Sequence, residues 1–269
     1  MAQIPPLFET ALSAILEASA EIMKIYGQNQ FDLKYKSDES PVTQADIKSS
    51  EIICKYLEKT GLPIICEETN IEDYTTRKSW EYFWLVDPLD GTKEFISRNG
   101  EFTVNIALVH LKTPILGLLT IPAKGLLYWG DKQNGAYRIK LSDIYQIDYN
   151  ELCQKAVKLP IVKKTKSLRV MVSRSHLDDK TMDYIQELRT KHKKVECISA
   201  GSSLKFCYIA EGEADIYLRF SPTMEWDTAA GQAIIEASGA YMVQMPSKSA
   251  FYYNKKSLRN EGFIVSRNI

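Results

Sequence analysis

The sequence predicts a layered protein of the mixed α+β and α/β classes, in which a β-rich first half precedes a half that alternates strands and helices. Apolar segments separated by turn residues follow one another from 102 to 139, and strand-like segments alternate with helical ones from 169 to 244. The 269 residues are 45% hydrophobic and 25% charged, which supplies a core for one large domain or two modest ones. We expect two halves, 1–145 and 146–269.

The first half is expected to open with two amphipathic helices. Leu12, Ile15 and Ile22 recur at helical spacing, and a second helix is predicted from about 46 to 59. The first helix lacks a basic leading region, which argues against a signal peptide, and no apolar run reaches the length of a membrane span. Two short apolar runs then end abruptly in carboxylates. They predict two strands, 63–66 and 82–86, with acidic residues at their carboxyl ends.

An antiparallel meander is predicted over 102–139, because Lys-Thr-Pro, Ala-Lys and Gln-Asn-Gly turn signals separate its β-rich segments. The polar stretch from about 142 to 167 is expected to be a loop or an insertion. In the second half the periodicity predicts strands at 169–173, 195–199, 214–219 and about 240–244, with helices around 180–190, from 203 and after Trp226.

The charge and cysteine counts exclude several classes of function. The 34 basic residues balance the 34 acidic ones, so we expect no non-specific binding to nucleic acid or to an anionic membrane. The three histidines show no metal-binding spacing, and any metal is therefore expected to be held by oxygen ligands. The five scattered cysteines contain no C-x-x-C pair and fit free buried thiols in a reducing cytoplasm.

The most informative motif is Asp87-Pro-Leu-Asp90-Gly-Thr92. The proline fixes a bend, so that both carboxylates and the carbonyl of Leu89 can converge on one divalent cation, and Gly91 permits close approach of the backbone. The same residues also describe a plain surface turn. Two further acidic motifs, Glu67-Glu68 and Glu225-Trp-Asp227, favour the metal site, although Asp227 would also serve as a helix N-cap.

These motifs, in this order and at this spacing, resemble the lithium-sensitive, magnesium-dependent phosphatases of the inositol monophosphatase superfamily. The resemblance runs from about Tyr35 to Ala240 and is carried by 40–46, 66–68, 87–92 and 226–231. Within the superfamily the chain is more similar to the CysQ-type 3'(2'),5'-bisphosphate nucleotidases, through 101–108, 173–176, 201–206 and 222–227. The resemblance implies a layered αβαβα sandwich.

The resemblance also implies two or three Mg²⁺ ions in the active site. Glu67, Asp87 and the carbonyl of Leu89 would hold one ion, and Asp87, Asp90 and Asp227 would hold the second. Glu67 would thereby help to activate the attacking water, while Thr92, held by Asp46, would take or steer its proton. Asp46 also fits the N-cap of the second helix, and capping and catalysis are compatible there.

The second half is expected to bind the substrate. Gly201-Ser202-Ser203 opens a helix, and its free N–H groups, two hydroxyls and Lys205 would suit an anion, although they equally describe an ordinary helix start. The resemblance implies that Ser202, Lys205 and Arg219 hold a 5'-phosphate, and that Gly91, Thr92 and Asp227 also contact the substrate. His176 would contact adenine, but Ser175-His-Leu-Asp178 reads as well as a capping box with a spectator histidine.

The resemblance therefore implies a cytoplasmic phosphatase that removes the 3'-phosphate of adenosine 3',5'-bisphosphate and leaves AMP, clearing a by-product of sulfate activation. The sulfated parent of that nucleotide is a further candidate substrate. One alternative keeps the chemistry but takes inositol monophosphate or fructose 1,6-bisphosphate, and another is a regulatory protein that binds metal or nucleotide without turnover. The partner is expected to be a small molecule; a monomer and a homodimer are both compatible, as is a location on the cytoplasmic face of the inner membrane.

Overall fold

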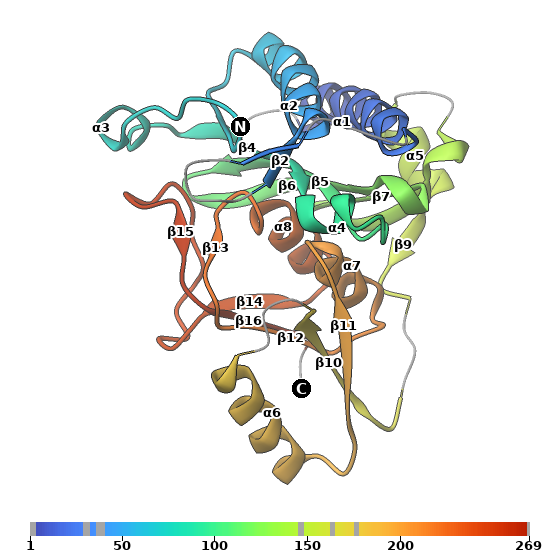
Figure 1. The fold of residues 1–269 in the computed structure, drawn as a ribbon, viewed down its shortest axis with the longest axis vertical. Helices are drawn as coiled ribbons and strands as arrows, with labels where there is room; N and C mark the ends of the chain where they lie inside the picture. The colour runs from blue at the N-terminus through green and yellow to red at the C-terminus, as the bar shows by residue number, and fades with distance from the viewer. Residues whose placement is uncertain are drawn as a thin grey trace.

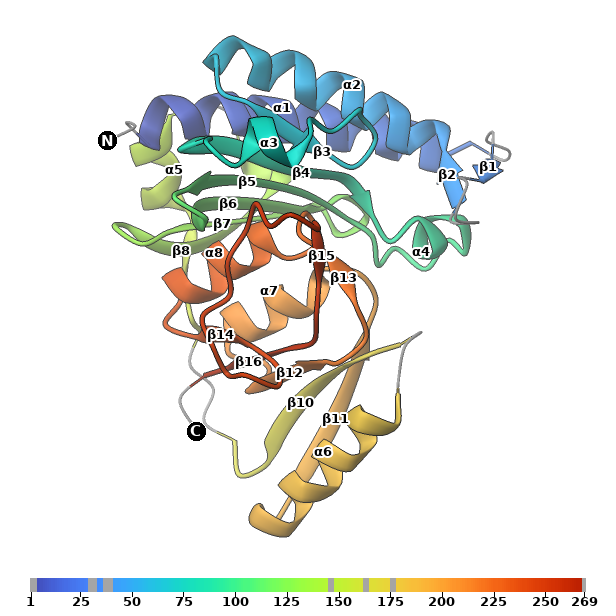
Figure 2. The same ribbon diagram turned by 90° about the vertical axis from the view of Figure 1, so that its left-hand side faces the viewer.

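A computed structural model describes residues 4–28, 33–35, 41–144, 148–161, 165–174 and 178–267. In these ranges the elements form five layers, which Figures 1 and 2 show from two sides. Helices α1 and α2 cover one face of a seven-stranded sheet, α7 and α8 lie between that sheet and a five-stranded one, and α6 covers the outer face of the latter. The predicted αβαβα sandwich is confirmed.

The larger sheet carries the acidic strand ends. Strands β3 and β4 are parallel, and every later pair in this sheet is antiparallel, so the predicted meander is confirmed. Because β3 and β4 are parallel neighbours, their carboxyl ends lie at one edge and bring Glu67 close to Asp87. In the order in which they pair, the strands are β3 (Ile64–Cys66), β4 (Tyr82–Asp90), β5 (Thr103–His110), β6 (Thr113–Ile121), β7 (Leu126–Asp131), β8 (Gly135–Lys140) and β9 (Val157–Leu159).

Helices α1 (Ile4–Tyr26) and α2 (Gln44–Leu57) pack side by side on this sheet. The apolar face of α1, which includes Leu12, Ile15 and Ile22, is fully buried, as its helical spacing predicts. Helix α2 begins with a capping box in which Thr43 and Asp46 satisfy each other's backbone N–H groups. It runs into a 3₁₀ turn, η1 (Glu58–Thr60), that ends at Gly61 as expected.

The expectation of a loop or insertion over about 142–167 is wrong in part. This stretch contains α5 (Tyr149–Lys155) and β9, which pairs with β8 and extends the larger sheet past residue 145. The hydroxyl of Tyr149 donates to Asp131, and its ring packs edge-on against Phe8 of α1. The sequence shows no clear apolar pattern for these elements, because α5 is short and the first two residues of β9 are exposed.

The smaller sheet has two parallel pairs around β10, while β16 pairs antiparallel with β12 and β14. The strands predicted in this half are present, whereas the sequence analysis did not predict β16. In spatial order the strands are β11 (Val195–Ala200), β10 (Leu168–Ser173), β12 (Ile216–Arg219), β16 (Phe263–Ser266) and β14 (Tyr241–Gln244). The helices of this half are α6 (Asp179–Lys191), α7 (Leu204–Glu211) and α8 (Ala229–Ala237).

The remaining elements are short and surround the acidic edge or connect the layers. Two of them matter for the site: α4 follows β4 directly, and α3 belongs to the segment between Glu67 and β4. The elements are β1 (Leu33–Tyr35), β2 (Pro41–Thr43), α3 (Tyr74–Arg77), α4 (Thr92–Ile96), η2 (Pro122–Lys124), η3 (Leu141–Asp143), β13 (Thr223–Met224) and β15 (Arg259–Asn260).

Helix α8 lies unusually close to the larger sheet, and small residues make this possible. A Cβ atom at Gly117 of β6 would lie 2.3 Å from the carbonyl oxygen of Ala230 and 2.9 Å from the Cβ of Ala233. The alanine-rich face of α8 and Gly117 therefore fit together without side chains between them. This packing fixes the start of α8 and, with it, the preceding Asp227.

In the described ranges, no helix combines the length and apolar character that a bilayer crossing requires. The five cysteines are free, as expected, but they are not all buried, because Cys197 is exposed on β11.

Candidate active site

A cavity of about 240 Å³ opens where the acidic edge of the larger sheet faces the start of α7. Eight of the predicted site residues line it: Glu67, Asp90, Gly91, Thr92, Ser202, Lys205, Arg219 and Asp227. Asp46, Asp87 and Leu89 lie behind its wall, where they are buried. His176 lies outside the described residues. The structure thus brings segments from both halves of the chain together around one cavity.

Four carboxylates repel one another at this edge. Asp87 is 1% exposed, and burial together with the charges of Glu67, Asp90 and Asp227 raises its pKa well above the usual range. Burial and Asp90 raise the pKa of Asp227 in the same way. A divalent cation would relieve this repulsion, and carboxylate oxygens are the ligands that Mg²⁺ prefers. The donor set therefore fits the expected metal.

Backbone and hydroxyl groups hold the three aspartates individually. Oδ1 of Asp87 accepts from the amide of Leu89 at 3.0 Å, and Oδ2 of Asp227 accepts from the amide of Met224 at 2.8 Å. Oδ2 of Asp90 accepts from both the amide and the hydroxyl of Ser203, at 2.7 and 2.6 Å. Within the described ranges no three His, Cys, Asp or Glu side chains already surround a single metal position. The carboxylates are neighbours, and their side chains would turn toward a common position only when a cation binds.

Thr92 and Asp46 form the contact that the resemblance implies. The hydroxyl of Thr92 donates to Oδ1 of Asp46 at 2.9 Å. Oδ2 of Asp46 accepts from the amide and the hydroxyl of Thr43, so the same carboxylate caps α2 and orients Thr92. Burial raises the pKa of Asp46, while these hydrogen bonds act in the opposite direction. Capping and orientation coexist in one side chain.

Lys205 adds a positive charge to the lining of the cavity. It is 3% exposed, and its Nζ donates to the carbonyl oxygens of Ala200 at 3.1 Å and Ser202 at 2.5 Å. An ammonium group has three donors, and these two bonds leave one that an anion can accept. Burial lowers the pKa of Lys205 to about 8, an effect that Arg219 reinforces and that Asp90 opposes.

Arg219 lies at the end of β12 and also lines the cavity. Its guanidinium donates to the hydroxyl of Ser173 at 3.0 Å and to the carbonyl oxygen of Ser221 at 3.2 Å. Together with Lys205 it provides two basic groups in the cavity that suit a phosphate. The two basic residues come from different elements, α7 and β12, in agreement with the helix predicted from 203 and the strand predicted at 214–219.

The expectation of free N–H groups at 201–203 is wrong for two of the three residues. The amide of Gly201 donates to Oε2 of Glu101 at 2.7 Å, and that of Ser203 donates to Asp90. The hydroxyl of Ser202 lies 3.0 Å from the carbonyl oxygen of Asp90 and 2.8 Å from the hydroxyl of Thr103. The loop therefore acts first as a support for the carboxylates.

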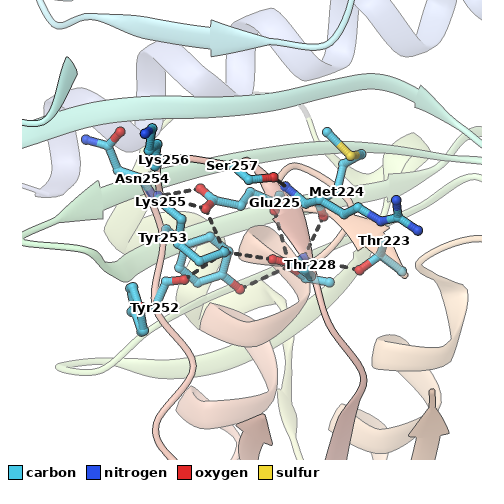
Figure 3. A network of polar contacts seen from close by, with 12 residues as sticks. Thr223, Met224, Glu225, Thr228, Tyr252, Tyr253, Asn254, Lys255, Lys256 and Ser257 are labelled. Atoms are coloured by element: carbon cyan, nitrogen blue, oxygen red, sulfur yellow. Dashed lines mark hydrogen bonds and ion pairs between the residues drawn. The ribbon is translucent and has the colours of Figure 1, made fainter. Parts of the chain in front are cut away.

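A second network of polar contacts holds Glu225, two residues before Asp227 in the chain, and Figure 3 shows Glu225 with Asn254 and Lys255. Glu225 is 0% exposed; its carboxylate accepts from the amide of Asn254 at 2.6 Å and from the amide and Nζ of Lys255, at 3.0 and 2.6 Å. Arg77 lies in α3, in the segment between Glu67 and β4, and donates to Oδ1 of Asn254 at 2.7 Å. The segment that carries Glu67 and the one that carries Asp227 are thus tied to the same loop.

The sequence analysis missed three residues of functional interest: Ser203, which holds Asp90; Glu225, which anchors the segment of Asp227; and Glu94, which lines the cavity. Glu225 and Ser203 belong to motifs in which other residues, Asp227 and Ser202, were predicted to form the site. Glu94 follows Thr92 by two positions and carried no signal of its own, because an acidic residue in a first helical turn is ordinary.

Comparisons with known proteins identify the family of the chain. A model of the inositol monophosphatase family matches residues 4–267. The Salmonella typhimurium protein named 3'(2'),5'-bisphosphate nucleotidase CysQ is 38% identical over 263 residues, covering 97% of this chain and 99% of its own. The Escherichia coli K12 protein of that name is 40% identical over 252 residues, covering 93% and 95%.

Solved structures with a similar fold belong to the same comparison. The crystal structure of CysQ from Bacteroides thetaiotaomicron, described as a bacterial member of the inositol monophosphatase family, superposes with a TM-score of 0.89 at 43% identity and covers 97% of both chains. The extragenic suppressor protein suhB of Bartonella henselae gives a TM-score of 0.73 at 20% identity, covering 98% of this chain and 94% of its own. At that identity the likeness concerns the fold alone.

Proposed function

Because the chain belongs to the inositol monophosphatase family, we propose that it is a Mg²⁺-dependent phosphatase that hydrolyses the 3'-phosphate of adenosine 3',5'-bisphosphate to give AMP. Its relatives named CysQ are bisphosphate nucleotidases, and its identity to them extends over nearly the whole chain. The sulfated parent of that nucleotide is a second candidate substrate. In the reaction water adds to phosphorus, the bond to the 3'-oxygen breaks, and that oxygen takes up a proton.

One observation carries the proposal: carboxylates and two basic side chains, Lys205 and Arg219, line a single cavity. A bisphosphate nucleotide has two phosphates joined by one ribose. The transferred phosphate would lie at the carboxylates, with the cations that they hold, beside Gly91 and Thr92. The retained 5'-phosphate would lie at Lys205 and Arg219, supported by Ser202. A monophosphate would leave the second group of charges without a ligand.

The family and its CysQ members are metal-dependent phosphatases, generally with Mg²⁺. We assign Glu67, Asp87 and the carbonyl of Leu89 to one ion and Asp87, Asp90 and Asp227 to a second. When bound, such ions neutralise charge on the phosphoryl and leaving oxygens and lower the pKa of water.

Thr92 and Asp46 would handle the proton of the attacking water. Since the Thr92 hydroxyl donates to Asp46, its own oxygen is free to accept a hydrogen bond from a water molecule in the cavity. Asp46 would fix the direction of the hydroxyl, and as the water gives its proton to the Thr92 oxygen, the Thr92 proton would pass to the Asp46 carboxylate. Asp227 would contact the leaving group, since it lines the cavity beside Asp90.

The test is phosphate release from adenosine 3',5'-bisphosphate in the presence of Mg²⁺, with identification of the nucleotide product. We expect AMP and inorganic phosphate, and little release by an Asp87→Asn/Asp227→Asn double variant. Formation of the 3'-monophosphate would show that the substrate binds in the opposite direction and would contradict the assigned roles of Lys205 and Arg219. Undiminished release by the double variant would contradict the metal assignment.

A further inference from the structure

Glu94 is an acidic side chain in the cavity that the proposed reaction does not use. It lies in the first turn of α4, two residues after Thr92, and its side chain lines the same cavity as Asp90 and Lys205. Burial raises its pKa, as do the charges of Asp90 and Glu101, whereas Lys205 acts in the opposite direction. Placing another negative charge beside two phosphates is unfavourable unless the substrate compensates for it.

The carboxylate of Glu94 has little to hold it within the protein. In the described part of the chain no other residue donates a hydrogen bond to it, and no basic side chain forms an ion pair with it. By contrast, the nearby Glu101 accepts from both Gly201 and Arg174. A partly buried carboxylate without an external donor retains its capacity to accept hydrogen bonds from a ligand.

Two glycines that line the cavity, Gly91 and Gly201, make room for this side chain. A Cβ atom at Gly201 would lie 2.7 Å from Cγ of Glu94, and a Cβ atom at Gly91 would lie 3.3 Å from its Oε2. Gly91 adjoins Asp90 and Thr92, whereas Gly201 adjoins Ser202 and leads into α7. Glu94 therefore lies between the site assigned to the transferred phosphate and the site assigned to the retained one.

The ribose is the part of a bisphosphate nucleotide that joins its two phosphates. Ionised phosphates have no donors for a carboxylate, but the ribose hydroxyl on the carbon next to the transferred phosphate is a donor. We propose that Glu94 accepts a hydrogen bond from this hydroxyl and thereby selects ribonucleotides over 2'-deoxyribonucleotides. This inference rests on the proposed function and adds to it a residue that determines specificity for the sugar.

The test compares kcat/KM for adenosine 3',5'-bisphosphate and for its 2'-deoxy analogue, measured with Mg²⁺ on the full chain. For the wild type we expect a preference for the ribonucleotide of about tenfold or more, the range of a hydrogen bond to a charged group. Glu94→Ala should reduce the preference to within about threefold of unity. The ratio is informative even if the variant turns over both substrates faster, because relief of phosphate repulsion affects both equally.

Glu94→Gln, which keeps the shape of the side chain, should give an intermediate ratio and covers the case in which the alanine variant does not fold. Glu51→Gln, at an exposed position of α2, is the matched control and should keep the wild-type ratio. A wild-type ratio near unity, or a ratio unchanged in both Glu94 variants, would overturn the inference. Absence of turnover of either nucleotide by the wild type would instead overturn the proposed function.

Discussion

The hydroxyl of Thr92 donates a hydrogen bond of 2.9 Å to Oδ1 of Asp46, which joins the first residue of α4 to the first turn of α2. The other oxygen of the same carboxylate accepts from the amide and hydroxyl of Thr43. A change at Asp46 would therefore disturb both the helix cap and the proposed catalytic contact. A change at Thr92 removes the contact and leaves the cap in place, so it isolates the catalytic role.

Thr92→Val should lower kcat for adenosine 3',5'-bisphosphate by roughly 100-fold or more, because it removes the hydroxyl that would accept from the water while keeping the shape of the side chain. Thr92→Ser keeps the hydroxyl and should retain most of the activity. Both variants should melt within about 2 °C of the wild type, since the cap of α2 remains intact. Equal activities of the two variants would argue against a role for the hydroxyl.

Asp87→Asn should stabilise the metal-free protein and remove its response to Mg²⁺. The substitution removes the charge of the buried Asp87 from a group of four neighbouring carboxylates, and relief of about 1 kcal/mol would raise the melting temperature by about 2–4 °C in EDTA. In the wild type, saturating Mg²⁺ should stabilise the fold by about 3 kcal/mol, whereas the variant should gain little. Differential scanning fluorimetry in EDTA and in Mg²⁺ measures both effects.

Asp183→Asn, at an exposed position of α6, is the control for this experiment and should behave like the wild type in both buffers. A melting temperature of Asp87→Asn in EDTA below that of the wild type would mean that the carboxylates stabilise the metal-free fold. That outcome would be at odds with the repulsion that we infer.

Binding of AMP should weaken as the pH rises through about 8. Since the pKa of Lys205 is lowered to about 8, the side chain is charged below that pH and neutral above it, and its attraction for a phosphate is lost in the same direction. Isothermal titration calorimetry between pH 7 and 9.5 should show the dissociation constant rising by up to about tenfold per pH unit above the pKa. Lys205→Met should bind AMP more weakly and show a flat profile.

The matched control for Lys205 is Lys180→Met on α6, whose exposed lysine does not line the cavity. It should reproduce the wild-type profile. An equally steep loss of affinity in Lys205→Met would assign the titration to another group.

Lys255→Met should destabilise the fold by about 3–5 kcal/mol, because it leaves Glu225 buried without its charged partner. The effect should be large since Glu225 is 0% exposed and the Lys255 side chain only 19% exposed. The double variant Glu225→Gln/Lys255→Met should recover part of the loss, because it removes the unpaired charge. Urea denaturation of the single and double variants measures this coupling; strictly additive losses would show that the pair does not interact.

The sequence predicted those parts of the fold that local patterns specify. The apolar runs in β3 and β4 are each followed by a carboxylate, and this pattern indicated that Glu67 and Asp87 lie near the ends of neighbouring strands. The predicted end of the second strand at residue 86 is wrong, because β4 continues through Asp87 to Asp90 with a register shift between these two residues. Helix α5 and strand β9 were missed because they are short and largely polar. Strand β16 was missed as well, and its place between β12 and β14 follows from pairing across the sheet, which no local pattern encodes.

The same distinction holds within the site. The carboxylates of the Asp87-Pro-Leu-Asp90 motif lie close together in the sequence, and the motif could be recognised directly. Glu225 and its partner Lys255 are 30 residues apart, and Ser203 and Asp90 are separated by 113. Contacts over such distances depend on how α8 and α7 pack between the sheets. They could only be identified once the fold was known.

The central claim is that the cavity selects a substrate with two phosphates on a nucleoside. It is tested most directly by measuring kcat/KM side by side for adenosine 3',5'-bisphosphate, inositol 1-phosphate and fructose 1,6-bisphosphate, at equal Mg²⁺. We predict that the nucleotide is preferred over both others by more than tenfold, which corresponds to about 1.4 kcal/mol in the transition state. A preference below tenfold, or a preference for either sugar phosphate, would contradict the account.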